Sequence, residues 1–152
     1  ERLREVGIRH IYADTSRLDE VLALPYCIVA SDGIVTSGED DDCDILWSSS
    51  TYGYTARVLE HYVRDKGLLT LEDAVHRMTR LPAKALGLTN RGTLTPGNQA
   101  DLVVFDPESI HDRSTPTEMA RHPVGIDVVL VNGSIAVDES GVTGAGAGLL
   151  AT

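Results

Sequence analysis

The sequence has few cysteines, few aromatic residues and few basic residues, and each shortage excludes a class of protein. Its 152 residues include two cysteines and 5% aromatic residues, and 13 Lys and Arg stand against 23 Asp and Glu. Two cysteines without a CxxC pair are too sparse for a disulfide scaffold, which predicts a cytoplasmic protein. The formal net charge of −10 predicts that neither nucleic acid nor an anionic membrane is a partner, because both require clustered cations.

Long apolar runs are also absent. No run approaches the roughly 20 residues that a membrane-spanning helix needs, so we exclude such a span from the sequence given. The charged opening Glu1–Glu5 shows neither an initiator methionine nor a signal peptide, and we expect the chain to begin within a longer protein. A composition of 42% hydrophobic and 24% charged residues is typical of a globular domain with its own core.

Apolar patterns near the start of the chain predict two strands around a helix. Residues 8–13 and 26–30 are short apolar-rich runs, and residues 17–24 place three aliphatic residues on one helical face. Strand, helix and strand in this order indicate a parallel α/β unit. Residues 34–55 then predict a long loop, and loops of that length are usually functional or disordered.

Three helices are predicted in the middle of the chain. An apolar stripe begins at Val58, and Lys66-Gly67 closes this helix with a cation and a glycine suited to a C-cap. Thr70 starts an approximate capping box for the second helix, in which Arg77 is expected to favour the negative end of the helix dipole. Residues 82–86 predict a short third helix, because proline suits a first helical position.

The pattern changes from helical to β near residues 88–92. Residues 100–105, 128–131 and 134–137 are rich in β-branched residues and predict strands. Asn132-Gly133 separates the last two runs and is the strongest hairpin signal in the sequence. The Gly- and Ala-rich tail that follows predicts an irregular arm.

Asp32 is the most informative single residue, because it ends an apolar run and is followed at once by Gly33. One interpretation is a simple turn, since both residue types favour turns for local reasons. The other is a buried strand that delivers a carboxylate to the rim of a sheet or barrel, where α/β enzymes assemble their active sites. The residues alone leave both interpretations open.

Ordered motifs along most of the chain resemble one enzyme family. The run Pro96–Asp106, followed by Val131-Asn132-Gly133, is similar to the C-terminal β segment of amidohydrolase-superfamily enzymes. Upstream, Ser31-Asp32-Gly33, Tyr52-Gly53 and residues 57–75 resemble N-acyl-D-amino-acid deacylases, also called D-aminoacylases. The β segment alone fits many amidohydrolases, whereas the joint order of the motifs narrows the resemblance.

The resemblance implies a fold, a cofactor and a role for Asp32. Such enzymes join a metal-dependent TIM-like barrel to a small β-sandwich, which implies an α/β fold with the last barrel strand or strands and helices in residues 1–90. Residues 91–152 would then supply the C-terminal β segment of the sandwich. In that family the aspartate that ends the last barrel strand takes a proton from a zinc-bound water and later returns one to the leaving amine. Asp32 matches this position, and zinc lowers the pKa of its water enough for a carboxylate base to suffice.

The substrate contacts are expected at Tyr52 and Arg57, although Arg57 at a helix start is equally suited to a structural pairing. The sequence departs from the family where members usually carry His-Pro-Arg, because Ser48-Ser49-Ser50 stand there. A cation that could hold a substrate carboxylate is therefore missing, which puts the specificity for acyl-D-amino acids in question.

No metal ligand is assigned in this chain. The resemblance implies zinc ligands on upstream strands outside it, and its five histidines show neither His-x-His nor HExxH spacing. The leading hypothesis is the C-terminal portion of a zinc-dependent amidohydrolase that hydrolyses N-acyl-D-amino acids and is inactive as an isolated chain. Its partners are an acylated amino acid and either the remainder of the barrel or another copy of itself. The alternatives are a non-catalytic remnant of the same fold and an amidohydrolase acting on cyclic amides.

Overall fold

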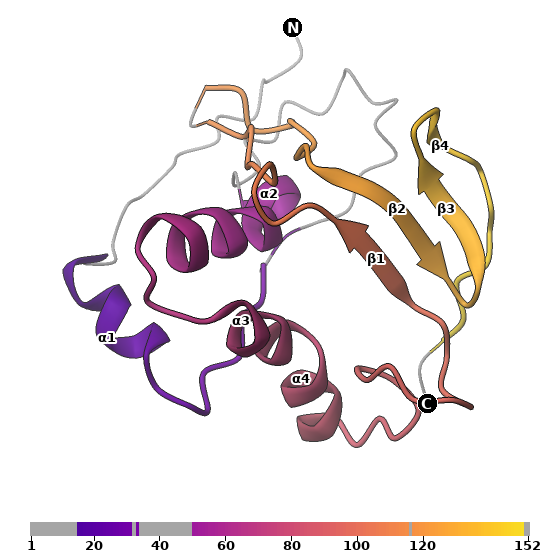
Figure 1. Cartoon of the computed structure of the whole chain (residues 1–152), viewed down its shortest axis with the longest axis horizontal. Helices are drawn as coiled ribbons and strands as arrows, with labels where there is room; N and C mark the ends of the chain where they lie inside the picture. The colour runs from indigo at the N-terminus through magenta and orange to yellow at the C-terminus, as the bar shows by residue number, and fades with distance from the viewer. Residues whose placement is uncertain (1–14, 32, 34–49, 116, 151–152) are drawn as a thin grey trace, which may run out of the picture.

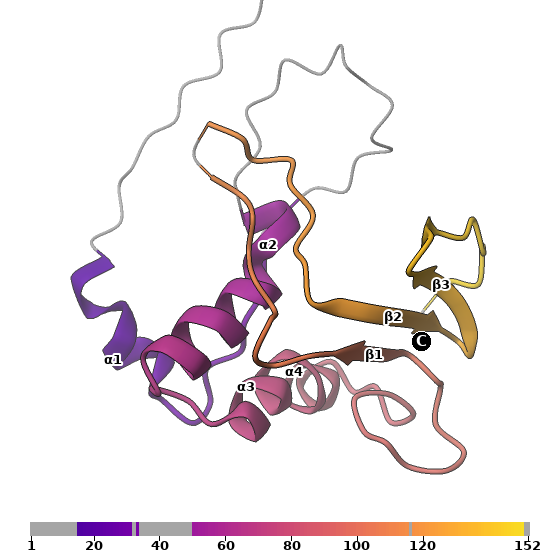
Figure 2. The same ribbon diagram turned by 45° about the horizontal axis from the view of Figure 1, so that its top comes forward.

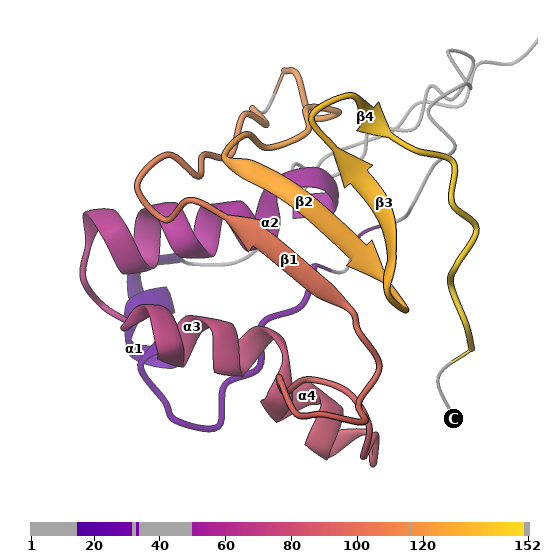
Figure 3. The ribbon, with the colours of Figure 1, turned by 45° about the vertical axis from the view of Figure 1, so that its right-hand side comes forward.

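The computed structural model describes residues 15–31, 33, 50–115 and 117–150, in which a set of helices precedes an antiparallel sheet (Figure 1). The helical elements are η1 (Thr15–Arg17), α1 (Leu18–Leu22), α2 (Ser50–Arg57), η2 (Val58–Asp65), α3 (Leu71–Met78) and α4 (Arg80–Ala85). The strands are β1 (Leu102–Phe105), β2 (Ile126–Val131), β3 (Ser134–Asp138) and β4 (Gly141–Val142), which pair in that order. The helices gather on one side of this sheet (Figures 1 and 3). No helix in the described ranges is long and apolar enough to cross a membrane.

The helix predicted to end at Lys66-Gly67 is confirmed, but it begins earlier than expected. It starts as α2 at Ser50 and continues as η2, a π-helix in which the Lys66 amide donates to the His61 carbonyl at 2.9 Å. Gly67 has a φ of +60°, so a residue without a Cβ closes the helix. The prediction of a loop was therefore wrong over residues 50–55. Gly53 weakened the helical pattern in the sequence, but burial of this part of the chain stabilises the helix.

α3 begins as its capping signal predicts, but one of its arginines has a different role. The Thr70 hydroxyl accepts the Asp73 amide at 3.1 Å. Arg77 was expected to lie at the helix end as a dipole partner, yet its side chain is 4% exposed and donates to the carbonyls of Leu22 and Leu24. The prediction missed this because the acceptors come from α1 and the turn after it, more than fifty residues away in sequence.

The short helix expected over residues 17–24 is confirmed as η1 and α1, whereas the strand expected over residues 26–30 was wrong. Of the apolar face, Leu22 is buried but Val21 is 49% exposed. Residues 27–31 form no strand: the Cys27 amide donates to the Leu24 carbonyl of the preceding turn at 3.1 Å, and the Val29 amide donates to the Arg77 carbonyl of α3 at 3.4 Å. A strand needs a neighbouring strand to pair with, and the described residues supply none there. The strand expected at residues 8–13 lies outside the described residues.

The predicted hairpin is confirmed. β2 and β3 pair antiparallel, and the turn residues Asn132 and Gly133 have φ values of 48° and 81°, as a type I′ turn requires. β1 pairs with the other edge of β2, with Val103 opposite Val129. The tail forms the two-residue β4 and then continues without helix or strand to residue 150, close to the irregular arm that was predicted.

The core lies between the helices and the first residues after β1. Its buried members are Ala56, Val58, Leu59, Leu69, Ala74 and Ile110. A cavity of about 540 Å³ adjoins this core between the helices and the sheet, with Leu59 and Met78 on one side and Val103, Phe105 and Val129 on the other. Alternation along the strands therefore directs Val104, Val128, Leu130 and Ile135 to the opposite face of the sheet.

Candidate functional site

Asp32 itself lies outside the described residues, but both of its neighbours are anchored to the start of α2. The Ser50 hydroxyl donates to the Ser31 carbonyl at 3.0 Å, and the Gly33 amide donates to the Ser31 hydroxyl at 3.0 Å. A Cβ on Gly33 would lie 2.8 Å from the Cα of Thr51, so only glycine allows this approach. The segment that carries Asp32 is therefore packed against the N-terminal turn of α2.

Tyr52 lies in that same turn and is half-buried. Its ring meets the imidazole of His122 edge to face, with 5.4 Å between the ring centroids and 80° between the planes. Arg57 is exposed at the other end of α2. Five helical residues turn the side chain by roughly 140°, so Arg57 and Tyr52 point to different sides of the helix. The structure thus brings Tyr52, but not Arg57, together with another polar ring.

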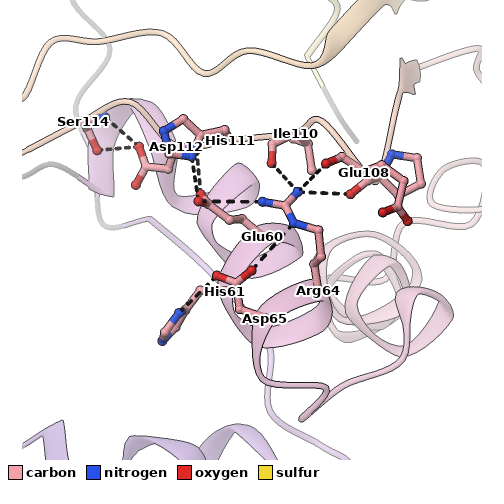
Figure 4. Close-up of polar contacts among 10 residues, drawn as sticks. Glu60, His61, Arg64, Asp65, Glu108, Ile110, His111, Asp112 and Ser114 are labelled. Atoms are coloured by element: carbon pink, nitrogen blue, oxygen red, sulfur yellow. Dashed lines mark hydrogen bonds and ion pairs between the residues drawn. The ribbon is translucent and has the colours of Figure 1, made fainter.

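Glu60 on η2 joins the helices to the connection between β1 and β2 (Figure 4). Its carboxylate contacts His111 Nδ1 at 2.6 Å and accepts the Asp112 amide at 2.9 Å. Burial alone raises the pKa of Glu60, but the amide of Asp112, the hydrogen bond and charge of His111 and the charge of Arg64 together lower it. The ionised carboxylate is therefore the form that this network stabilises.

Arg64, one helical turn further along η2, holds the same connection at its start. Its guanidinium donates to the carbonyls of Ile110 at 2.8 Å and of Pro107 and Glu108 at 3.2 Å each. Three carbonyls of one short segment thereby converge on one side chain (Figure 4). A guanidinium suits this arrangement because it presents several donors in a fixed plane.

Gly53 allows the connection to approach α2 closely. The Asp112 carboxylate accepts the Ser114 amide at 2.9 Å and its hydroxyl at 2.6 Å, and it lies directly over Gly53. A Cβ on Gly53 would be 1.8 Å from Asp112 Oδ1, which no side chain could occupy without displacing the carboxylate. Sequence reasoning did not identify this contact, although a glycine inside a helical pattern is the signal that points to such an approach.

The two ends of the connection pair with each other above α2. His111 and Val124 exchange both backbone hydrogen bonds at 3.1 Å, as an isolated antiparallel bridge. Figure 2 shows the connection rising past α2 before it returns to β2. Glu60 thus holds His111, and His111 holds Val124. These contacts place the nearby His122 against the ring of Tyr52. Tyr52 was a predicted site residue, whereas His111, His122 and Val124 were not.

The described part of the chain does not by itself form a metal centre. In residues 15–31, 33, 50–115 and 117–150, no three His, Cys, Asp or Glu side chains are arranged so that they could hold a metal ion. Zinc sites need three or four such ligands. The described residues therefore do not form a zinc site by themselves. The ligands of any bound metal would have to include residues outside the described ranges.

Several known proteins are similar to this chain in sequence and fold. A model described as "Amidohydrolase family" matches residues 27–137. The chain is 40% identical to N-acyl-D-glutamate deacylase and to D-aminoacylase of Alcaligenes xylosoxydans xylosoxydans, over 87% and 96% of its length. It covers only 26% and 29% of those two relatives. The N-acyl-D-glutamate deacylase of Bordetella bronchiseptica, whose structure contains zinc and a phosphonate inhibitor, superposes with a TM-score of 0.74 at 41% identity, over 83% of this chain and 25% of that one.

Proposed function

This chain belongs to the amidohydrolase family, and on that premise we propose that it is part of an enzyme that hydrolyses the amide bond of N-acyl-D-amino acids. The observation that carries the proposal is the 40% identity to D-aminoacylase over 96% of the chain. The second relative, N-acyl-D-glutamate deacylase, points to the same substrate class. The chain spans less than a third of either relative, so the activity is proposed for the whole protein that contains it.

The finer architecture follows from the same family. Residues 1–90 are proposed to belong to a TIM-like barrel and residues 91–152 to a small β-sandwich. Two observations support this division. Every described helix of five or more residues ends by Ala85, whereas β1 begins at Leu102. The sheet also carries apolar residues on both faces, as expected of a sheet that is covered on both sides, here by the helices and by a second sheet.

Asp32 is the proposed acid–base residue. It takes a proton from the attacking water and delivers one to the amine that leaves when the amide bond breaks. The anchoring of Ser31 and Gly33 to α2 supports this role, because a catalytic carboxylate requires a fixed backbone.

Zinc is the proposed cofactor of the whole protein, with ligands outside the described residues. The deacylase of Bordetella bronchiseptica contains zinc in its structure. When bound, zinc supplies a Lewis acid that activates water and polarises the amide carbonyl. Tyr52 and Arg57 remain the proposed substrate contacts of this chain, and Tyr52 is the better placed because it lies in the turn that holds Ser31 and Gly33.

The direct test compares Asp32→Asn with Asp127→Asn in the full-length protein that contains this chain. Asp127 is an exposed acid on β2 and serves as the matched control. We expect D32N to lose roughly 10²–10⁴-fold in kcat on N-acyl-D-amino acids while its zinc content is unchanged, and D127N to lose almost nothing. A D32N variant that keeps most of its rate would contradict the acid–base role.

The same assay separates the alternatives. If the zinc-loaded wild-type protein hydrolyses cyclic amides and leaves N-acyl-D-amino acids intact, the substrate class is wrong while the family remains. If it binds no zinc and hydrolyses neither class, the chain is part of a non-catalytic remnant. Turnover by the isolated 152-residue chain would show that this chain needs no further part of the protein for activity.

A further inference from the structure

The turn of α2 that holds Ser31 and Gly33 carries no cation. Its described residues are Ser31, Gly33 and residues 50–55, none of which is Lys, Arg or His. An N-acyl amino acid, the substrate class proposed above, carries a carboxylate beside the amide to be cleaved. A site that holds such a carboxylate needs a donor with positive charge or with a free N–H. The described residues of this turn offer only neutral N–H and O–H donors, so a positively charged donor must come from another element.

The connection between β1 and β2 supplies candidate donors next to this turn. Besides His111, which Glu60 holds, its exposed basic side chains are Arg113, Arg121 and His122. Arg121 is paired with Glu118 at 2.9 Å, which offsets its charge. Of the three, His122 has its ring against Tyr52, with 5.4 Å between the centroids.

Several contacts fix the position of His122. Val124, two residues away, exchanges two hydrogen bonds with His111, and His111 contacts Glu60 on the helix that continues α2. The edge-to-face contact with Tyr52 orients the imidazole itself. An imidazole keeps at least one N–H donor in every ordinary protonation state, and it becomes a cation when protonated. The ring is therefore both held in place and chemically suited to a carboxylate.

We propose that His122, together with Tyr52, binds the carboxylate of the N-acyl amino acid and so determines which acylated substrates the enzyme accepts. The proposal rests on the proposed deacylase function. His122 takes the part of a cation that the serines at residues 48–50 do not supply. No proton transfer or covalent step is assigned to it.

The test uses the zinc-loaded full-length protein and the variant His122→Phe, which keeps a ring against Tyr52 but has no N–H donor. Each enzyme is assayed on an N-acyl-D-amino acid and on the matching N-acyl amine, in which hydrogen replaces the carboxylate. We expect H122F to raise KM for the N-acyl-D-amino acid roughly tenfold, with kcat within about twofold. KM for the N-acyl amine should not change. His76→Phe, at an exposed histidine on α3, is the matched control and should alter neither value.

Two further variants make the outcome decisive. His122→Gln retains an N–H donor and should recover part of the lost affinity, which a purely structural role would not predict. If H122F does not fold, H122Q and His122→Ala are compared in the same two assays. Equal KM changes on both substrates, or a larger effect of Arg113→Ala than of H122F, would overturn the proposal. A wild-type enzyme that is active while H122F matches it refutes this inference alone, whereas a wild-type enzyme without deacylase activity refutes the proposed function as well.

Discussion

The helices and the sheet differ in how far their apolar side chains are buried. Ala56, Leu59 and Ala74 on the helices are at most 6% exposed. On the sheet face that points away from the helices, Val104 is 50% and Ile135 is 48% exposed. α2, η2 and α3 thus bury these side chains within the described residues, whereas the outer face of the sheet leaves Val104 and Ile135 about half exposed. A sheet with apolar residues on both faces is typical of one layer in a larger assembly.

The largest expected effect is on the free energy of unfolding, and it tests this difference in burial. Leu59→Ala removes a side chain that is 6% exposed and should lower the free energy of unfolding by about 2–5 kcal/mol. Ile135→Ala on the outer face of the sheet should cost less than about 1 kcal/mol. Urea denaturation of the purified chain, followed by circular dichroism, measures both. If the two variants lost equal free energy of unfolding, the outer face of the sheet would be covered in solution, and the two regions would not differ in burial.

A second substitution tests the contact between the two regions. Gly53→Ala places a Cβ 1.8 Å from Asp112 Oδ1 and must displace that carboxylate, at a cost of about 1–3 kcal/mol. Asp112→Ala removes the obstacle, so the double variant should be more stable than the sum of the two single losses predicts. Thermal unfolding of the four proteins gives this coupling. Additive losses would show that the two residues are not in contact.

The smallest expected effect concerns the pH dependence of the Glu60 contact. The pKa of Glu60 lies below its ordinary value of 4.5 in the folded protein. The unfolded chain therefore binds the proton more tightly, and the stability that Glu60 contributes is present above pH 4.5 and is lost as pH falls through the folded pKa. Glu60→Gln should remove this part of the acid sensitivity and cost about 1–2 kcal/mol at neutral pH. Urea unfolding between pH 3 and 7 measures it, and parallel curves for the two proteins would exclude the contribution.

Short sequence signals correctly predicted those features whose formation depends only on residues nearby in the sequence. The cap at Thr70, the closing glycine at Gly67 and the Asn132-Gly133 turn each act within a few residues, and all three are confirmed. The family resemblance is confirmed as well, because it rests on the order of motifs along the chain. The strand at residues 26–30 was wrong because it depended on partner strands that the described residues do not contain.

The candidate site was harder to predict, since it depends on contacts between distant residues. Tyr52 was a predicted substrate contact, but His122, which lies 70 positions later, had no motif to mark it. The contact between Glu60 and His111 likewise spans 51 positions. Such pairs follow from the path of the connection between β1 and β2 and not from any local pattern. The position of Asp32, which motif order alone suggested, stays a prediction.

The buried Arg77 also has a consequence for the order of folding. α1 has five residues, too few to form a stable helix alone, and no side chain caps its start. Arg77 donates to the carbonyl of the last residue of α1, Leu22, and to that of Leu24 in the turn that follows, more than fifty residues earlier in the sequence. α1 can therefore persist only after α3 has formed and docked, because a contact of this separation must first overcome the entropy of closing the intervening loop. The first helix of the chain is, on this basis, among the last to become stable.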